Sequence, residues 1–327
     1  MSVTIVRYSE SLRTEWDAFV SHAINGTFLH GRSFYDCNPS NAADDHSLMF
    51  YSGNRLLALL PGTLYTGDVG QTFHSHNRST YGGFLFNRRV GIQEAVDIVG
   101  ALLHHLRVIG VGSAIIRSPF RILYDQISDE FEYAMWYHGF HVASREAEVY
   151  VDLTPPIDTI RSRFEKATRN NITRAYKDTE ISIDGLGDIE QFWILLGHNL
   201  ATKHGTKPTH SLESIRKLIG AFGVEKIRLF AAYVEGRLAA GCLVFTPCPS
   251  VLHAQYIAQD YELQASRPLN ALIDSIITWG NANGFRSFNL GTANEGGHVI
   301  NAGLFHFKEG FGGRSVLRET HRWDVNG

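Results

Sequence analysis

The 327-residue sequence has few of the features that mark secreted, membrane or disulfide-bonded proteins. Its first residues, MSVTIVRYSE, lack the basic segment and apolar run of a signal peptide. No apolar stretch approaches the roughly 20 residues needed to span a bilayer. The three cysteines, Cys37, Cys242 and Cys248, are odd in number and lack CxxC spacing. We therefore expect a reduced, cytoplasmic protein without a membrane span.

Several common catalytic motifs are also absent, among them the GxSxG elbow, the Walker A loop and HExxH. The sixteen histidines suggest metal binding, but their placement does not. His104 and His105 are adjacent on a predicted helix and point to different faces, and His74 and His76 have no carboxylate at ligand spacing. We predict no metal site. The net charge of −3 does not indicate a nucleic-acid or anionic membrane partner, so such a contact would need a local basic patch.

The composition is that of an ordinary globular chain, and the length suggests roughly two domains of about 150 residues. A weak internal repeat agrees with this. Residues 51–58 (YSGNRLLA) and 233–240 (YVEGRLAA) each place a Gly-containing turn between apolar runs, which predicts a β-hairpin. Each hairpin is followed by a helical pattern, at 95–107 and 269–282, and then by a short strand. The sequence therefore predicts a duplicated α/β domain with a mixed sheet and flanking helices.

The boundary between the two halves is predicted near residue 150. Residues 149–153 alternate in the manner of a strand, and Pro155-Pro156 should open a helix at about Ile157. This divides the chain into domains 1–150 and 151–327, with no low-complexity linker between them.

A basic segment follows the boundary. Residues 161–177 contain six Lys or Arg and one acid, Glu165, and their apolar positions have roughly helical spacing. One interpretation is the solvated face of a helix. The other is a patch that binds the phosphates of a nucleotide, of CoA or of tRNA.

A Gly-rich polar loop follows the predicted strand that ends at Leu290. It contains Asn294, Glu295 and Asn301 and leads into Lys308-Glu309, which are flanked by aromatic residues. A purely structural loop needs glycine but has less use for this set of polar side chains. Because loops at strand ends commonly carry function, we predict a site here.

These segments, together with Lys203-His204-Gly205, His253-Ala-Gln-Tyr256, FNLG at 288–291 and FKEGFG at 307–312, resemble the FemAB-like branch of the GNAT acyltransferases. The resemblance covers residues 150–320 well and the N-terminal half loosely. It implies two tandem GNAT-like domains and transfer of an acyl or aminoacyl group to an amine. Relatives use either acyl-CoA or, among peptidoglycan bridge enzymes, aminoacyl-tRNA.

The sequence departs from the family at the loop that holds the CoA pyrophosphate, usually Q/R-x-x-G-x-G/A. The corresponding residues 264–270 contain no glycine. Pro268 in the first turn and Ser266 near the cap still leave a helix N-terminus that favours anions, and Arg267 can add a positive charge. A phosphate site is therefore predicted from Ser266, Arg267 and Asn270.

The resemblance and the chemistry of amide formation assign the remaining roles. We expect an N-acyltransferase that moves an acyl group from acyl-CoA to a small amine, an amino sugar or a nucleotide sugar, as in cell-surface polysaccharide biosynthesis. The predicted catalytic residues are Lys308, Glu295, Tyr256 and Glu309. The predicted substrate contacts are His204, Asn289, Asn294, Asn301 and Arg169.

Alternatives remain for the residues and for the chain. Lys308 could instead form a surface ion pair with Glu309. An aminoacyl-tRNA-dependent transferase and a non-catalytic binding protein on the same fold are the other functions. The N-terminal half is interpreted as a degenerate GNAT-like partner that shapes the acceptor cleft. The oligomeric state is left open.

Overall fold

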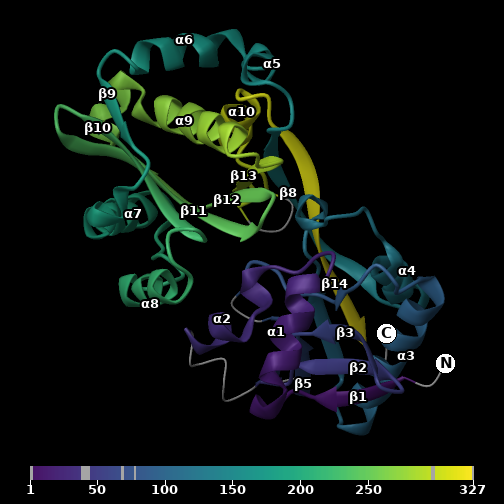
Figure 1. Cartoon of the computed structure of the whole chain (residues 1–327). Helices are drawn as coiled ribbons and strands as arrows, with labels where there is room; N and C mark the ends of the chain where they lie inside the picture. Colours follow the sequence, from purple (N-terminus) through teal and green to yellow (C-terminus); the bar gives the residue numbers. More distant parts are fainter. Residues whose placement is uncertain (1–2, 38–44, 68–69, 77–78, 296–298, 326–327) are drawn as a thin grey trace. The chain divides into compact units, whose positions relative to one another are not determined.

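The computed structural model describes residues 3–37, 45–67, 70–76, 79–295 and 299–325, except for the side chain of His204 (Figure 1). The chain forms two compact units. The first comprises Met1–Glu146 and Leu317–Gly327, and the second comprises Ala147–Val316. Residues 317–327 thus belong to the first unit, whereas the sequence prediction placed them in the second. The reason is non-local strand pairing, because Thr320–Asp324 pair antiparallel with Ser113–Arg117.

The first unit contains two groups of strands, in the orders β1-β2-β3-β6 and β4-β5-β7-β14. Trp16 and Val20 of α1 pack with Met49, Leu59 and Leu85 of the first group. The elements are β1 (Thr4–Arg7), α1 (Arg13–His22), α2 (Arg32–Asp36), β2 (Leu48–Ser52), β3 (Arg55–Leu60), β4 (Thr63–Gly67), β5 (Gly70–His74), β6 (Leu85–Phe86), α3 (Ile92–Val108), β7 (Ser113–Arg117), α4 (Glu130–Tyr137) and, from the far end of the chain, β14 (Arg314–Asp324).

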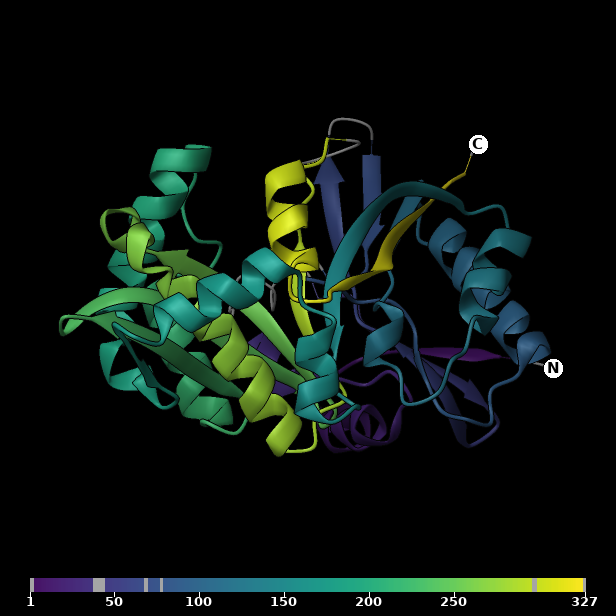
Figure 2. The same cartoon turned by 90° about the horizontal axis from the view of Figure 1, so that it is seen from above.

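The second unit has one sheet in the order β8-β13-β12-β11-β10-β9, which is mixed because β12 and β13 run parallel. Helices α9 and α6 lie on one face of this sheet, and α7 and α8 lie on the other (Figures 1 and 2). The elements are β8 (His141–Asp152), α5 (Ile157–Ser162), α6 (Lys166–Ala175), β9 (Thr179–Ser182), α7 (Ile189–His204), α8 (Leu212–Phe222), β10 (Ile227–Val234), β11 (Arg237–Cys248), β12 (Val251–Gln259), α9 (Pro268–Ala282), β13 (Ser287–Thr292) and α10 (Ala302–Glu309). The predicted mixed α/β fold is confirmed.

The core of the second unit lies between the sheet and α9. Leu252 and Ala254 of β12 point into it together with Phe288 of β13, as the two-residue period of a strand requires. On the opposite face α7 packs very closely on β11. A Cβ atom at Gly241 would lie 2.4 Å from the Phe192 ring, so only glycine fits there.

The internal repeat is present in the backbone. In the two predicted hairpins Ser52 pairs with Arg55, and Val234 pairs with Arg237. Both hairpins also have a one-residue register shift at the same place, so that Leu57 and Ala239 lack partners on β2 and β10.

The two units share a second structural feature. Each contains two parallel strands that pair over three positions and are joined by a long helix, α3 or α9. His74 of β5 and His253 of β12 occupy the same position in these pairs. The residue opposite His74 is Ile115, whereas the residue opposite His253 is Asn289.

Candidate functional site

The candidate site is built where β12 and β13 separate. Only the first three residues of β12 pair with β13, and the last pair is His253 with Asn289. Immediately afterwards Gln255 forms a bulge, because Leu243 pairs with Tyr256 while Val244 pairs with Ala254. A bulge bends and twists its strand, which gives a physical reason for the separation. We call this place the fork.

Lys308 reaches the fork from α10. Its side chain is buried, and Nζ donates hydrogen bonds to the carbonyl oxygens of Gly291 (2.9 Å) and Thr292 (2.6 Å) of β13. Burial lowers the pKa of Lys308 to about 8, while the Glu148 carboxylate acts in the opposite direction. Glu309, the next residue, is exposed. A surface ion pair between these neighbours therefore does not describe the structure.

Asn289 connects the groups around Lys308. Its Nδ2 lies 3.1 Å from Glu148 Oε2 and 3.0 Å from His253 Nδ1, and its Oδ1 accepts from the backbone N–H of Gly291 at 2.8 Å. A carboxylate only accepts and a backbone N–H only donates, so the amide orientation is fixed by its partners. Nδ2 then donates to His253 Nδ1, and the proton of the neutral His253 ring is on Nε2.

Sequence reasoning missed Glu148 and His253 as members of this cluster. Glu148, on β8, is buried, and so are His253 and Asn289. The sequence placed Glu148 at a domain boundary, where a glutamate is unremarkable. The available signal was that Glu148 precedes an apolar strand and that His253 follows the apolar pair Val251-Leu252, since buried polar groups need partners.

The polar residues of the Gly-rich loop mostly hold the loop itself. Asn294 Oδ1 accepts from the Ala147 N–H (3.0 Å) and from Thr292 Oγ1 (2.9 Å). Asn301 caps α10 through the Leu304 N–H and donates to Glu295 Oε1 at 2.7 Å. Glu295 is exposed and is positioned by Asn301. Residues 296–298 lie outside the described residues.

Tyr256 lies apart from Lys308 in its contacts and packs toward α7. Its hydroxyl is 2.7 Å from His210 Nδ1 and accepts from the His210 backbone N–H at 3.3 Å, and its ring meets Trp193 edge-on. Burial lowers the pKa of His210 and raises that of Tyr256, so both are neutral at pH 7. His210 was not singled out in the sequence. His204 ends α7, but its side chain lies outside the described residues.

The predicted phosphate-binding residues gather at the start of α9. Arg267 adopts a left-handed conformation at the N-cap, Pro268 occupies the first turn, and the buried Asn270 lies two residues further on. Arg267 Nε is buried and has no acceptor among the described residues. Ser266 ends the preceding short 3₁₀ helix. A helix N-terminus beside an unsatisfied guanidinium N–H is suited to an anion.

The basic segment is interrupted, because α5 and α6 are separate helices and not the single helix expected. Several of its charged side chains already form ion pairs or hydrogen bonds within the second unit. Arg161 makes a bidentate ion pair with the fully buried Asp274 of α9 (3.0 and 2.7 Å), which also accepts from the Tyr176 hydroxyl. Arg169 donates to the Phe164 carbonyl oxygen and so ties the two helices together.

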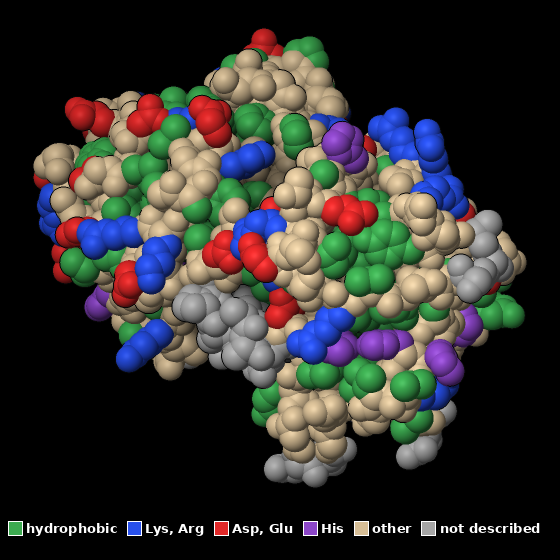
Figure 3. Space-filling model, turned by 60° about the horizontal axis from the view of Figure 1, so that its bottom comes forward, with side chains coloured by type: hydrophobic (Ala, Val, Ile, Leu, Met, Phe, Trp, Pro, Cys, Tyr) green, Lys and Arg blue, Asp and Glu red, His purple; other side chains and the backbone are tan. Residues whose placement is uncertain are grey.

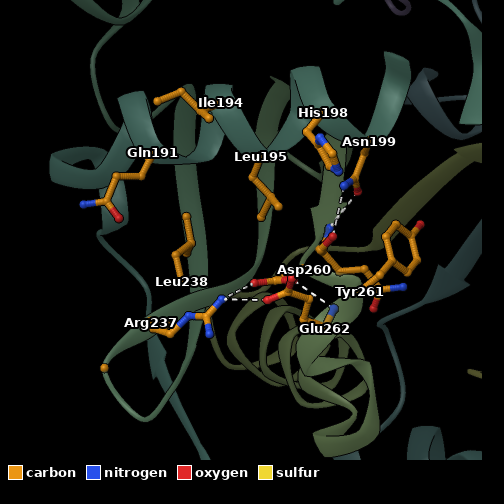
Figure 4. A pocket seen from close by; sticks show the side chains of 12 residues that line it. Gln191, Ile194, Leu195, His198, Asn199, Arg237, Leu238, Asp260, Tyr261 and Glu262 are labelled. Atoms are coloured by element: carbon orange, nitrogen blue, oxygen red, sulfur yellow. Dashed lines mark hydrogen bonds and ion pairs between the residues drawn. The ribbon is translucent and has the colours of Figure 1, made fainter. Parts of the chain in front are cut away.

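A separate pocket of about 600 Å³ lies between α7, the β10–β11 turn and the end of β12 (Figure 4). Ile194 and Leu195 form part of one wall, and Asn199 bonds both backbone groups of Gln259. Arg237 crosses the floor to Asp260 (3.0 Å) and Glu262 (3.4 Å). Its charged groups are therefore already paired with one another, and it contains none of the predicted site residues.

In the view of Figure 3, acidic and basic side chains are intermixed over part of the visible face, and some Lys and Arg side chains also form a group of their own. Within the part of the chain that the structure describes, none of the helices is both long and apolar enough to cross a bilayer. In the same residues no group of three or more His, Cys, Asp or Glu side chains is arranged to hold a metal ion.

Comparison with known proteins gives a family match for most of the second unit. Residues 160–309 match the family described as acetyltransferase (GNAT) domain. The crystal structure of FemX is similar with a TM-score of 0.71 and 12% identity, covering 99% of this chain and 98% of that one. No curated protein matches the sequence.

Two further solved structures have the same fold. The C-terminal domain of a putative lysylphosphatidylglycerol synthetase from Agrobacterium fabrum has a TM-score of 0.62 and 14% identity, covering 98% of this chain and 93% of that chain. A tandem GNAT protein from the clavulanic acid biosynthesis pathway has a TM-score of 0.54 and 10% identity, with 99% of both chains covered. The chain therefore has the same fold as FemX and the tandem GNAT protein, and its residues 160–309 match the GNAT acetyltransferase domain.

Proposed function

We propose that the second unit is an N-acyltransferase that moves an acyl group from acyl-CoA to the amine of a small molecule, an amino sugar or a nucleotide sugar. The observation that carries this proposal is the buried ammonium of Lys308 at the fork between β12 and β13. A buried cation costs free energy, so its retention there favours a role in stabilising negative charge.

The donor is proposed to bind with its phosphates at the start of α9. The support is the unsatisfied Arg267 Nε together with the N-terminal N–H groups of a 15-residue helix. Helix α9 packs on β12 and β13, which pair over residues 251–253 of β12. The fork lies at the end of this paired stretch, and β12 is the strand that precedes α9 in the chain. The neighbouring strand β13 carries the Gly291 and Thr292 carbonyl groups to which Lys308 donates.

The reaction needs two contributions from the protein, which are stabilisation of the developing negative charge and acceptance of the proton that the amine loses. The amine nitrogen attacks the thioester carbonyl, the C–S bond breaks, and the proton lost by nitrogen ends on the released thiol. An ammonium at Lys308 can stabilise the oxyanion or the departing thiolate. The proton acceptor is assigned to the Tyr256–His210 pair or to Glu295, because a neutral His210 and an exposed carboxylate can both take a proton.

The test is a binding and turnover screen of the full chain. Calorimetry with CoA, acetyl-CoA and longer acyl-CoAs measures donor affinity. Release of free thiol in the presence of simple amines, UDP-amino sugars and dTDP-amino sugars then measures transfer. Binding of a CoA thioester and amine-dependent thiol release are expected. If no CoA species binds at millimolar concentration, the donor assignment is wrong.

An aminoacyl-tRNA donor is the second candidate, because α6 presents basic side chains on one exposed face. Lys166, Arg169 and Arg174 lie on this face, while Thr168 and Ile172 on the other face are buried. A protein that neutralises several phosphates should lose affinity steeply with salt. Binding of aminoacyl-tRNA with such a salt dependence, combined with no binding of acyl-CoA, would replace the first proposal.

A further inference from the structure

The cluster around Lys308 contains a second buried charge that the proposed chemistry does not use. Glu148 has 1% of its surface exposed and Asn289 has none, so both are as deeply buried as Lys308. Burying a carboxylate is costly unless it is paired and hydrogen-bonded. Glu148 therefore needs a reason to be there, and its surroundings supply one.

Asn289 links Glu148 to the residue whose carbonyl oxygen contacts Lys308. The amide donates to Glu148 Oε2 with one end and accepts from the Gly291 N–H with the other. The carbonyl oxygen of Gly291, which belongs to the next peptide group, receives a hydrogen bond from Lys308 Nζ. Glu148 thus fixes the side chain that holds the backbone of Gly291, and it also supplies negative charge near the ammonium.

Among the described residues, the arrangement leaves one N–H of the ammonium available for a substrate. An ammonium has three N–H groups, and the carbonyls of Gly291 and Thr292 take two of them. Gly291 has a φ of +77°, a conformation suited to glycine, and places no side chain beside Nζ. The third N–H can therefore be directed at a developing negative charge.

We propose that Glu148 is a positioning residue that keeps Lys308 charged and, through Asn289, holds it in place at the fork. This proposal deepens the proposed acyl transfer and rests on it for its catalytic meaning. Its physical content is independent of the substrate. The titratable groups in the cluster are Glu148 of β8 and His253 of β12, and Glu148 supplies the charge opposite to that of Lys308.

The experiment measures Lys308 directly. The chain has seven lysines, so selective ¹³C labelling of lysine gives a simple NMR spectrum, and the Lys308 signal is identified by its loss in Lys308→Met. In Glu148→Gln we expect the pKa of Lys308 to fall by about one unit or more, a tenfold change in its proton affinity. Glu180→Gln, the same change at an exposed residue of β9 in the same unit, should not move it. An unchanged Lys308 pKa in a folded Glu148→Gln variant overturns the proposal.

A second measurement uses the wild-type protein, in case Glu148→Gln does not fold. With glutamate labelled at Cδ, the Glu148 signal should show an inflection at the pH where Lys308 titrates. A Glu148 signal without this inflection also contradicts the proposal. Activity assays distinguish the positioning role of Glu148 from the proposed acyl transfer. If the Lys308 pKa shifts as expected but no donor is turned over, the positioning role stands and the proposed function fails. With a proven donor, the alkaline limb of kcat should move to lower pH in Glu148→Gln.

Discussion

Replacement of Lys308 by Met should change how the stability of the second unit depends on pH. Lys308 has a pKa of about 8 in the folded protein against 10.5 ordinarily. Below pH 8 the amine is charged in both the folded and the unfolded protein, so the folded protein bears the full free-energy cost of burying that charge. Above pH 10.5 it is neutral in both states and the cost is gone. The stabilising contribution of the depressed pKa is therefore present at high pH and is lost as pH falls through about 8.

The magnitude follows from the shift of the pKa. The full difference between the two values corresponds to about 3 kcal/mol, and about 2 kcal/mol of it develops between pH 7 and 9.5. Over that range the wild type should gain about 2 kcal/mol relative to Lys308→Met. The hydrogen bonds lost from the carbonyls of Gly291 and Thr292 add an offset that does not vary with pH in this range. Only the pH-dependent part tests the argument.

The assay must report on the second unit alone, because two compact units need not unfold together. Of the five tryptophans, Trp193 and Trp279 lie in the second unit. Urea unfolding of protein labelled with fluorotryptophan, followed by ¹⁹F NMR, resolves their signals. A stability difference between wild type and Lys308→Met that stays constant within about 0.5 kcal/mol from pH 7 to 9.5 would refute the desolvation of this amine.

Three other changes test the site and its frame. With a proven donor, Lys308→Met should lower kcat about 10²–10³-fold, and the activity of the wild type should decline above about pH 8 as Lys308 loses its proton. The control Lys217→Met, on the exposed side of α8, should leave kcat unchanged. Full turnover in Lys308→Met would remove Lys308 from catalysis. Arg267→Glu should weaken donor binding measured by calorimetry by about tenfold or more, and an unchanged affinity in a folded variant moves the phosphate site elsewhere. Arg161→Ala should destabilise the second unit by about 2 kcal/mol because it leaves the buried Asp274 without its cation. Adding Asp274→Leu should restore much of that stability. If Arg161→Ala does not change the stability, the hydrogen bond from Tyr176 is enough to stabilise Asp274.

Much of the fold was predictable because its signals are local. The hairpin of β10 and β11, the start of α5 after Pro156, and the helix α9 followed by a strand all depend on turn residues, breakers and apolar periods within short windows. The return of β14 to the first unit was not predictable in this way. It depends on pairing between Thr320 and Arg117, about two hundred residues apart in the chain.

The site was predicted less completely than the fold. Lys308 was singled out by its place after the Gly-rich loop and by family resemblance, but its burial follows from tertiary packing that local patterns do not encode. Glu148 and Asn289 meet through the register between β8 and β13. Arg161 looked like part of a free basic patch because its partner, Asp274, lies more than a hundred residues away. The loop asparagines looked like ligand contacts, yet Asn294 and Asn301 make backbone hydrogen bonds within the unit.

The paired parallel strands of the two units show how one residue changes what a duplicated frame can hold. In the first unit Ile115 stands where Asn289 stands in the second, so this position has no amide to bridge a buried acid and a backbone N–H of the strand. Beyond Ile115, the Arg117 carbonyl oxygen of β7 accepts a hydrogen bond from the backbone N–H of Gly82. In the second unit the matching position holds Asn289, whose amide connects Glu148 with Gly291 beside the buried Lys308 ammonium. The same pair of parallel strands thus carries a polar network in one unit and an apolar residue at the matching position in the other.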